Sequence, residues 1–442
     1  MSGFPELLPE QQIVFNRCFQ IVREAFERFG YVPIETPSVE RKEILTSKGS
    51  EEKEIYALAR LQAQAGEGTE TEFALHFDLT VPLARFVAQH KDKLTFPFRR
   101  YQMQKVWRGE RAQKGRYREF YQCDIDVIGR GSVSLLNDAE IPCIIYQVFT
   151  KMAIGKFVIR VNNRRLLQGF FEFEGVPAAL IGDVLRSVDR LDKTGRDKVL
   201  ADLTDTLNLS STLAESILSI TSHSLPTDQL LSHLASLPAC ANPLYAQGLS
   251  ELQTVVKAMR SLGMPADSFV VDPGVARGLG YYTGTVYETK LIDQPDLGSI
   301  CSGGRYDDLA SYFTNEKLPG VGISIGFSRL IFALLDRGVL AAGAQTTAHV
   351  LVSTMDVGRI ADYLGLASQL RDNDVSTEVY FERKGLGDQL KFASRKGFKL
   401  VIIAGETEFA AGTVKIKDLR TAIEVGCNLP DLVSTVQNLL LN

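Results

Sequence analysis

A long helical stretch divides the strand-rich part of this sequence. Between about Gly169 and Met264, the strings FEFEGVPAALIGDVLRSVDRL, TGRDKVLADL and STLAESILSITSH carry helical spacing and almost no strand signal. Strand patterns come before this stretch and resume at Ser268. One core rarely organises 442 residues, so we expect a domain of strands and helices at residues 1–338 that is interrupted by a helical insertion at 170–264.

A linker and a further domain follow Val339. The small residues of AAGAQTTA indicate a linker at 339–348. Beyond it, HVLVST, VSTEVYF, KLVIIAG and TVKIKDL are apolar strand patterns that alternate with helical segments, which is typical of βαβ units. We therefore expect a separate α/β domain at 349–442.

The composition favours an ordinary globular protein. Hydrophobic residues make up 45% and charged residues 23% of the chain, which argues against wholesale disorder. No apolar run approaches the roughly 18 residues of a membrane span, and the N-terminus MSGFPELLPEQQ does not resemble a signal peptide, so we expect a cytoplasmic protein without a membrane partner. The six cysteines form no CxxC pair and the five histidines are dispersed, so neither a disulfide framework nor a structural metal site is expected.

Residues 94–129 have the pattern of two strands joined by a basic loop. Positions 99–118 hold eight Arg or Lys residues against one acid, in a chain whose net charge is −4. A solvated hairpin tip is one interpretation of such a run. Arginine prevails over lysine, however, and its planar guanidinium binds phosphate through two hydrogen bonds, so a polyanion site is the other interpretation.

The second of these strands has one polar face. A period of two separates Tyr, Cys, Ile and Val on one side from Phe120, Gln122, Asp124 and Asp126 on the other. An aromatic ring, phosphate-binding arginines and carboxylates around one cleft would suit a purine nucleotide together with a cationic or polar small molecule.

Three glycine-containing segments are further candidates. In ARGLGYYTGTVYE (276–288), a tight bend is one interpretation, but a buried Arg277 would need an anionic partner such as a phosphate or a carboxylate. The glycine pair of CSGGRYDDL (301–309) would let a ligand approach the backbone. In GVGISIGFSRLIFALL (320–335), a strand runs into a helix that has Arg329 near its start. This arginine would either bind an anion at the helix N-terminus or lie exposed to solvent. No GxxxxGK[ST], GxGxxG or GxSxG motif is present, so arginines would have to bind any ATP.

Together these segments resemble the class II aminoacyl-tRNA synthetases and, among them, the histidyl-tRNA synthetase family. YVPIETPSVE resembles motif 1, which builds the dimer interface, WRGERAQKGRYREFYQCDIDVIG resembles motif 2, and GISIGFSRL resembles motif 3. RGLGYYTGTVYE and SGGRYDDL resemble the two histidine-specific signatures. The resemblance implies an α+β fold, with an antiparallel β-sheet flanked by helices, a helical insertion and a C-terminal α/β anticodon-binding domain. It also implies a homodimer.

The resemblance implies an ATP-dependent ligase that joins L-histidine to tRNA(His) through a histidyl-adenylate, releasing pyrophosphate and AMP. Mg²⁺ would be bound mainly through the ATP phosphates. In the family, an acid and a threonine hold the substrate α-amino group, and further side chains recognise the imidazole. The corresponding residues are Asp78 and Thr80, assisted by Gln122, for the α-amino group, Asp126 and Tyr282 for the imidazole, and Tyr281 and Tyr306 for the pocket wall.

The resemblance assigns the ATP site to arginines and one aromatic ring. Arg108 would contact the α-phosphate and the histidine carboxylate, and Arg116 the γ-phosphate. Arg277 would take the catalytic place at the α-phosphate, and Phe120 and Arg329 would sandwich the adenine. The chain departs from the family pattern at Gly280, where an Asp is usual, and at Ala112, where the motif 2 loop usually has a proline.

Two other functions would also place nucleotide-binding features in such a sequence. A non-catalytic synthetase paralogue can serve as the regulatory subunit of ATP phosphoribosyltransferase in histidine biosynthesis. Such paralogues typically lack the C-terminal domain and lose the arginine signature, whereas this chain keeps Arg108, Arg277 and Arg329. An unrelated nucleotide-binding structural protein would require several motif matches to be coincidental.

Overall fold

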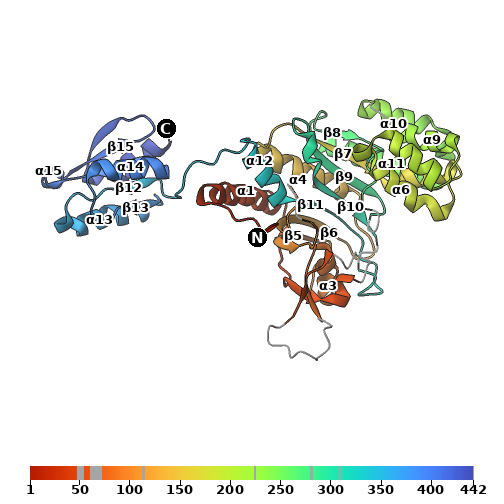
Figure 1. The fold of residues 1–442 in the computed structure, drawn as a ribbon, viewed down its shortest axis with the longest axis horizontal. Helices are drawn as coiled ribbons and strands as arrows, with labels where there is room; N and C mark the ends of the chain where they lie inside the picture. The colour runs from red at the N-terminus through yellow and green to blue at the C-terminus, as the bar shows by residue number, and fades with distance from the viewer. Residues whose placement is uncertain are drawn as a thin grey trace. The chain divides into compact units, whose positions relative to one another are not determined.

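The computed structural model of the chain describes residues 1–46, 54–59, 72–111, 115–222, 225–278, 282–307 and 310–441 (Figure 1). Its contacts define two compact units. The larger unit comprises residues 1–5 and 19–339, and the smaller unit comprises residues 6–18 and 340–442.

An eight-stranded sheet forms the centre of the larger unit, with the order β1-β5-β6-β11-β10-β9-β7-β8. Its inner pairs are antiparallel, while the edge pairs β1–β5 and β7–β8 are parallel. The α+β class and the antiparallel sheet flanked by helices are therefore confirmed. The strands are β1 (Val32–Pro33), β5 (Phe98–Trp107), β6 (Glu119–Ile128), β7 (Phe157–Asn163), β8 (Phe269–Val271), β9 (Thr285–Leu291), β10 (Ser299–Tyr306) and β11 (Gly320–Ile325).

The alternation predicted for β6 distinguishes the two faces of this sheet. Cys123, Ile125 and Val127 are fully buried on the face that packs against α4 (Leu136–Met152) and α12 (Phe327–Asp336). On the same face, the Tyr287 hydroxyl of β9 donates to the Asp138 carbonyl oxygen of α4 at 2.6 Å. Burial of apolar surface here, at roughly 25 cal/mol per Å², fixes the sheet against its helices and leaves the opposite face for polar groups.

A small sheet and two helices lie beside the β5–β6 hairpin. The sheet has the order β2-β4-β3. Helix α3 (Thr80–His90) starts shortly after β4, and Asp78 Oδ1 accepts a hydrogen bond from Val81 N at 3.2 Å. That N–H belongs to the first turn of α3 and has no partner within the helix. The other elements are α1 (Pro9–Arg28), β2 (Val39–Arg41), α2 (Lys42–Thr46), β3 (Ala57–Leu58) and β4 (Phe73–Leu75).

The described residues between β7 and β8 form helices, which confirms the helical stretch. Helix α11 contacts β7 and α10 contacts β8, so the helices gather beside that edge of the sheet (Figure 1). The helices are α5 (Arg164–Phe173), α6 (Ile181–Asp189), α7 (Leu191–Thr194), α8 (Arg196–Ala201), α9 (Ser211–Thr221), α10 (Thr227–Ser236) and α11 (Pro243–Ser261).

A five-stranded sheet with the order β13-β12-β14-β15-β16 forms the centre of the smaller unit. Strand β12 pairs in parallel with β13 and β14, as βαβ connections require, while β15 and β16 add antiparallel pairs. Strand β16 was not predicted, because a single residue of this edge strand, Cys427, is buried and no apolar period marks it. The elements are β12 (Val350–Val352), α13 (Ile360–Arg371), β13 (Thr377–Val379), α14 (Leu386–Lys396), β14 (Leu400–Ile403), α15 (Glu406–Ala410), β15 (Thr413–Asp418), β16 (Glu424–Asn428) and α16 (Leu432–Leu441).

Within the described ranges, no helix is both long enough and apolar enough to cross a membrane.

Candidate functional site

A row of polar side chains crosses the large sheet on the face opposite α4 and α12. Residues that pair directly across neighbouring strands point to the same face. The register places in one such row, from β5 to β7, Gln102, Asp124, Ser324, Ser302, Glu288 and Arg160. Segments more than a hundred residues apart in sequence thus build one polar surface.

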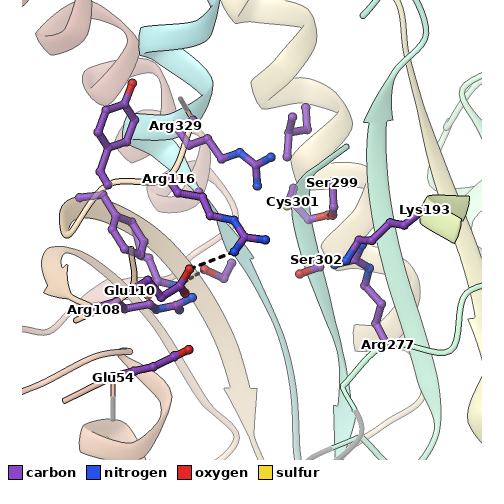
Figure 2. A pocket seen from close by; sticks show the side chains of 17 residues that line it. Glu54, Arg108, Glu110, Arg116, Lys193, Arg277, Ser299, Cys301, Ser302 and Arg329 are labelled. Atoms are coloured by element: carbon purple, nitrogen blue, oxygen red, sulfur yellow. Dashed lines mark hydrogen bonds and ion pairs between the residues drawn. The ribbon is translucent and has the colours of Figure 1, made fainter. Parts of the chain in front are cut away.

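A cavity of about 430 Å³ opens on this surface. Figure 2 shows Arg108, Arg116 and Arg329 on one side of it and Arg277 and Lys193 on the other. These side chains come from the β5–β6 hairpin, from α12, from the segment before β9 and from α7. The three arginines that the sequence singled out, at positions 108, 277 and 329, therefore share one cavity.

Contacts with the chain orient the arginines on the hairpin side. Arg108 Nε donates to the Phe77 carbonyl oxygen at 3.1 Å, and the Arg108 guanidinium carbon lies 5.2 Å from the centre of the Phe120 ring. Arg329 Nη2 donates to the Leu297 carbonyl oxygen at 2.7 Å. Each guanidinium has further N–H groups, so these contacts position the side chains without using all of their donors.

The buried Glu288 of β9 anchors Arg277 on the opposite side. Arg277 Nε lies 2.6 Å from Glu288 Oε1, and the Glu288 side chain is only 2% exposed. The other oxygen, Oε2, accepts a hydrogen bond from Arg160 Nη1 at 2.6 Å. Arg160 is held in turn by Asp272 (2.6 Å) and by Asp192 of the segment α7 (2.5 Å). A buried carboxylate thus anchors Arg277 at the wall of the cavity.

Positive charge prevails in this cavity. Its lining has five Arg or Lys side chains against the two carboxylates of Glu54 and Glu110, and Glu110 pairs with Arg116 at 3.3 Å. Burial lowers the pKa of Arg329, and the positive charges of Arg116 and Arg277 lower it further. The first turn of α12, beginning at Gly326, also lines the cavity, and a helix N-terminus favours anions. The cavity is therefore suited to a polyanion.

A smaller cavity of about 60 Å³ lies next to it, and Ser324 lines both. The Tyr306 hydroxyl donates to Asp126 Oδ1 at 2.9 Å, and Arg100 Nη2 lies 2.5 Å from Asp126 Oδ2. The contact with Arg100 is an ion pair without hydrogen-bond alignment, since no nitrogen of this arginine has a hydrogen-bond partner among the described residues. The remaining wall residues are Thr80, Asp124, Tyr282, Gly322 and Ile323.

Glycine is required at position 322, where β11 faces β6. A Cβ atom there would lie 1.8 Å from Asp126 Oδ1. Any other residue would therefore displace the Asp126 carboxylate from its partners Tyr306 and Arg100. Strand β11 leads into α12, and its glycine at position 322 also leaves room for the Asp126 carboxylate at the smaller cavity.

The carboxyl groups near the smaller cavity have raised pKa values. Burial raises the pKa of Asp124 to about 7 and the pKa values of Asp126 and Asp78 to about 6. The positive charge of Arg100 opposes the rise for Asp124 and Asp126, and the Val81 N–H and the charge of Arg108 oppose it for Asp78, but the effect of burial is larger in each case. A cationic ligand stabilises carboxylates in such surroundings. The smaller cavity is thus suited to a cation or a hydrogen-bond donor.

Most of the predicted site residues line the two cavities. The larger cavity includes Arg108, Arg116, Phe120, Gln122, Arg277 and Arg329. The smaller cavity includes Thr80, Asp126, Tyr282 and Tyr306. Asp78 is buried at the start of α3 and is not part of the described lining of either cavity. Tyr281, and the departures at Gly280 and Ala112, lie outside the described residues.

The two strands joined by a basic loop, predicted at 94–129, are present as β5 and β6, but not all of the basic residues at 99–118 belong to the loop. Arg99, Arg100 and Lys105 belong to β5. They pair with Glu140, Asp126 and Glu119 respectively, and so stabilise the protein itself. A run of charges along the chain does not reveal which of them will meet acids on neighbouring strands and helices.

The glycine pair of β10 also differs from expectation. A Cβ on Gly303 would lie 2.2 Å from the Gly322 carbonyl oxygen, and a Cβ on Gly304 would lie 2.9 Å from the Tyr282 ring. The close approach is therefore made by the protein's own strands β9 and β11 and by Tyr282, because the Thr285 carbonyl oxygen would lie 2.6 Å from a Cβ on Gly304. Neither glycine belongs to the described lining of the two cavities.

Several site residues were missed by sequence reasoning. Asp124 was placed on the correct face of β6 but received no role, although its position between Gln122 and Asp126 was a usable signal. Glu288 and Ser302 lie within quoted motifs, but their importance depends on strand register. No local pattern distinguishes Lys193 from an ordinary surface lysine.

No group of three or more His, Cys, Asp or Glu side chains suitable for a metal ion occurs in the part of the chain that the structure describes. Glu54 and Glu110 provide carboxylates in the larger cavity. Mg²⁺ commonly binds through one or two carboxylates together with substrate phosphates. This donor set therefore fits a Mg²⁺ ion that arrives with a polyphosphate.

Comparisons with known proteins identify the family of the chain. Residues 3–330 match the family model described as histidyl-tRNA synthetase, and residues 349–439 match the model described as an anticodon binding domain. The chain is 45% identical to a histidine–tRNA ligase of Xanthomonas campestris pv. campestris (strain 8004), over 98% of this chain and 95% of that protein. It is also 45% identical to a histidine–tRNA ligase of Stenotrophomonas maltophilia (strain K279a), over 98% and 96%.

Crystal structures give the same picture. The histidyl-tRNA synthetase from Nostoc sp. PCC 7120 superposes with a TM-score of 0.92 and 40% identity, over 99% of this chain and 98% of that one. A structure described as an ATP phosphoribosyltransferase regulatory subunit/histidyl-tRNA synthetase from Bacillus halodurans C has a TM-score of 0.71 and 20% identity, over 89% and 95%. The second likeness concerns the fold alone.

Proposed function

The chain belongs to the histidyl-tRNA synthetase family, and we propose that its two cavities divide the substrates of this family's reaction between them. The protein is a class II histidine–tRNA ligase, which joins L-histidine to tRNA(His) at the expense of ATP. First, a carboxylate oxygen of histidine attacks the α-phosphorus of ATP, and pyrophosphate leaves. Then a ribose hydroxyl at the tRNA end attacks the carbonyl carbon of the histidyl-adenylate, and AMP leaves.

One observation carries the proposal: Arg108, Arg277 and Arg329 line the same cavity, although they come from distant parts of the sequence. An excess of positive charge in a cavity of about 430 Å³ matches a nucleoside triphosphate in both sign and size. The Phe120 ring and the Arg329 guanidinium offer two flat surfaces for the adenine. Arg116 would meet the γ-phosphate.

The arginines would act on the first chemical step. Negative charge accumulates around the α-phosphorus as the carboxylate attacks and the bond to the leaving pyrophosphate breaks. Arg108 and Arg277, which approach from opposite sides of the cavity (Figure 2), would stabilise that charge. Because Glu288 and the Phe77 carbonyl already hold them, little reorganisation is needed when the charge develops.

Histidine would occupy the smaller cavity, with its carboxylate toward the arginines. Asp126 would accept a hydrogen bond from the imidazole N–H, since Tyr306 and Arg100 fix the position of its carboxylate. Tyr282 would complete the imidazole contacts. A buried acceptor of this kind rejects amino acids without a matching donor, because the acceptor would then remain unpaired.

Mg²⁺ would be held mainly by the ATP phosphates, with Glu54 or Glu110 as the nearby protein carboxylates. When bound, the ion would neutralise phosphate charge and favour the departure of pyrophosphate. Arg108, Arg116 and Arg277 would orient the phosphate chain around it.

We assign tRNA recognition mainly to the C-terminal α/β domain. We place this domain at 349–442, after a linker at 339–348, and we place the catalytic domain at 1–338 with the insertion at 170–264. The match of residues 349–439 to an anticodon binding domain supports the assignment. Removal of residues 349–442 should abolish tRNA charging while leaving adenylate formation in place; normal charging by the shortened chain would contradict it.

We further propose that the enzyme acts as a homodimer in the cytoplasm, where tRNA charging takes place. The segment YVPIETPSVE, which resembles motif 1, supports dimerisation. It contains the edge strand β1 and the exposed apolar residues Val32 and Val39. Sedimentation of the purified chain should give twice the mass of one chain; a single-chain mass at micromolar concentration would argue against the dimer.

The decisive experiment is exchange of labelled pyrophosphate into ATP. Purified protein should catalyse the exchange only when L-histidine is present. Histidine binding without exchange would favour the non-catalytic regulatory paralogue, which is less supported because the arginine set and the C-terminal domain are both present.

A further inference from the structure

We propose that Asp124 binds the α-ammonium group of the histidine substrate directly. The inference rests on the proposed function, because it assumes that histidine occupies the smaller cavity. It goes beyond the family resemblance, which assigns the α-amino group to Asp78 and Thr80 with help from Gln122.

Asp124 has a buried oxygen without a hydrogen-bond partner among the described residues. Its side chain is 3% exposed and lines the smaller cavity. Its Oδ1 atom accepts no hydrogen bond from any residue that the structure describes. Buried polar atoms are normally satisfied, and the exceptions are often found where a ligand binds. A substrate N–H group would provide the missing donor.

Neighbouring side chains orient the Asp124 carboxyl group. Gln122 Nε2 donates to Ser324 Oγ at 2.6 Å, so the serine hydroxyl proton is available for another acceptor. Burial raises the pKa of Asp124, and the Ser324 hydroxyl opposes this rise, as a hydrogen-bond donor to the carboxyl group would. Ser324 pairs directly with Asp124 across β6 and β11, which fixes the geometry of this contact. The chain from Gln122 through Ser324 therefore orients Asp124 and leaves Oδ1 for a ligand.

The spacing of polar side chains along β6 matches the length of the histidine substrate. Gln122, Asp124 and Asp126 lie on one face, roughly 7 Å apart in succession. Gln122 lines the cationic cavity, and Asp126 lies at the Tyr306 end of the smaller one. If the carboxylate of histidine faces the arginines and its imidazole faces Asp126, its α-carbon lies between them. The α-ammonium group then lies opposite Asp124.

Asp78 is less well placed for direct contact. One of its oxygens already accepts the Val81 N–H of α3. It is also absent from the described lining of the smaller cavity. Asp78 would attract the α-ammonium group by its negative charge without touching it. It would also help to position Thr80, which lines the cavity.

The charge balance supports the same conclusion. The positive charge of Arg100 on β5 acts on both Asp124 and Asp126 of β6, whereas Arg108 acts more strongly than Arg100 on Asp78. Arg100 forms its ion pair with Asp126. Among the described residues, Asp124 has no ion pair within 4.0 Å. An α-ammonium group would supply the missing positive charge.

The test compares Asp124→Asn with Asp78→Asn in the full-length chain. The readouts are the dissociation constant of L-histidine and that of 3-(imidazol-4-yl)propionate, which lacks the α-amino group. In Asp124→Asn, histidine binding should weaken roughly 10- to 100-fold, whereas binding of the propionate should change less than about threefold. Asp78→Asn should weaken histidine binding less. The KM for ATP should remain near that of the unchanged protein.

A folding readout separates this role from a structural one. Without ligand, Asp124→Asn should unfold at or above the temperature of the unchanged protein, because a buried carboxylate without an ion-pair partner has been removed. The inference would be overturned if Asp124→Asn weakened the binding of both ligands equally. It would also be overturned if only Asp78→Asn weakened the binding of histidine selectively. Failure of the unchanged protein to exchange pyrophosphate would refute the proposed function instead, so the two failures are distinguishable.

Discussion

The two neighbouring cavities have opposite electrostatic character, although they share Ser324 and one face of one sheet. The larger has five cationic side chains, of which Arg108 and Arg329 are held by backbone carbonyls and Arg277 by Glu288. The smaller is surrounded by carboxylates, and Arg100 is the buried cation beside them. A ligand with a cationic head and a carboxylate tail can lie across this boundary in only one favourable direction. The difference explains how one surface can orient an amino acid against a triphosphate.

The two cavities also differ in how their charges are stabilised. The arginines of the larger cavity are at least partly exposed; the Arg277 side chain, for example, is 27% exposed. Asp124 and Asp126 are almost fully buried. Substitutions in the larger cavity should therefore affect chemistry more than folding. In the smaller cavity, the effect on folding should depend on whether the acid has an ion-pair partner.

Replacement of Arg277 by alanine should have the largest effect on catalysis. Pyrophosphate exchange should fall by about 1,000-fold, since a preorganised charge at the reacting phosphorus is lost. The fold should persist, because Glu288 keeps Arg160 as a partner. Arg337→Ala is a matched control, as this arginine pairs with Asp296 and is not in the described lining of the cavity. Comparable losses in both variants would contradict the role of Arg277.

Asp126→Asn should be the most destabilising change in the smaller cavity. It removes the ion-pair partner of Arg100, whose side chain is completely buried, and breaking such a pair typically costs about 3–5 kcal/mol. Urea unfolding should give a clearly lower free energy of unfolding for Asp126→Asn than for Asp124→Asn. If both variants lose the same stability, the distinction between a paired and an unpaired acid is wrong.

Glu288→Gln should lower kcat for pyrophosphate exchange by roughly 10- to 100-fold. The substitution retains the shape of the side chain but removes the charge that holds Arg277 at Nε. The KM for histidine should change little, because Glu288 is not in the described lining of the smaller cavity. Glu251→Gln, which affects the partner of Arg165, provides a control for loss of a glutamate charge. A rise in the histidine KM at constant kcat would contradict a positioning role for Glu288.

The smallest expected effect is on the pH dependence of histidine binding. Asp124 has a pKa of about 7 in the empty site because of burial, so it is protonated below that pH. Only the carboxylate attracts an ammonium group, so the histidine KM should rise about tenfold from pH 8 to pH 6. In the Asp124→Asn variant, the part of this rise in KM that comes from protonation of Asp124 should be absent. Asp78, Asp126 and the histidine imidazole titrate in both proteins, so the comparison isolates Asp124; parallel pH profiles would contradict the assignment.

The sequence predicted those parts of the site that depend on local pattern. The period of two in β6 placed Gln122 and Asp126 on the polar face, and the motif residues Arg108 and Arg277 reached the predicted cavity. The helical insertion and the βαβ part of the C-terminal sheet were also visible, because helical and strand periods differ.

The contacts that could not be predicted from the sequence depend on the register between distant strands. Arg100 meets Asp126, and Glu288 meets Arg160, through pairings that local periodicity does not specify. Lys193 enters the cavity from the insertion, where its helix has the pattern of an ordinary solvated segment. The unpartnered oxygen of Asp124 could be recognised only after Ser324 and Gln122 had been placed beside it.

A crystal structure with L-histidine and α,β-methylene-ATP would test the division of substrates most directly. We expect the α-phosphate between Arg108 and Arg277, the adenine between Phe120 and Arg329, and the histidine α-ammonium within hydrogen-bond distance of Asp124. A nucleotide bound outside the arginine-lined cavity, or a histidine whose imidazole lies away from Asp126, would contradict it.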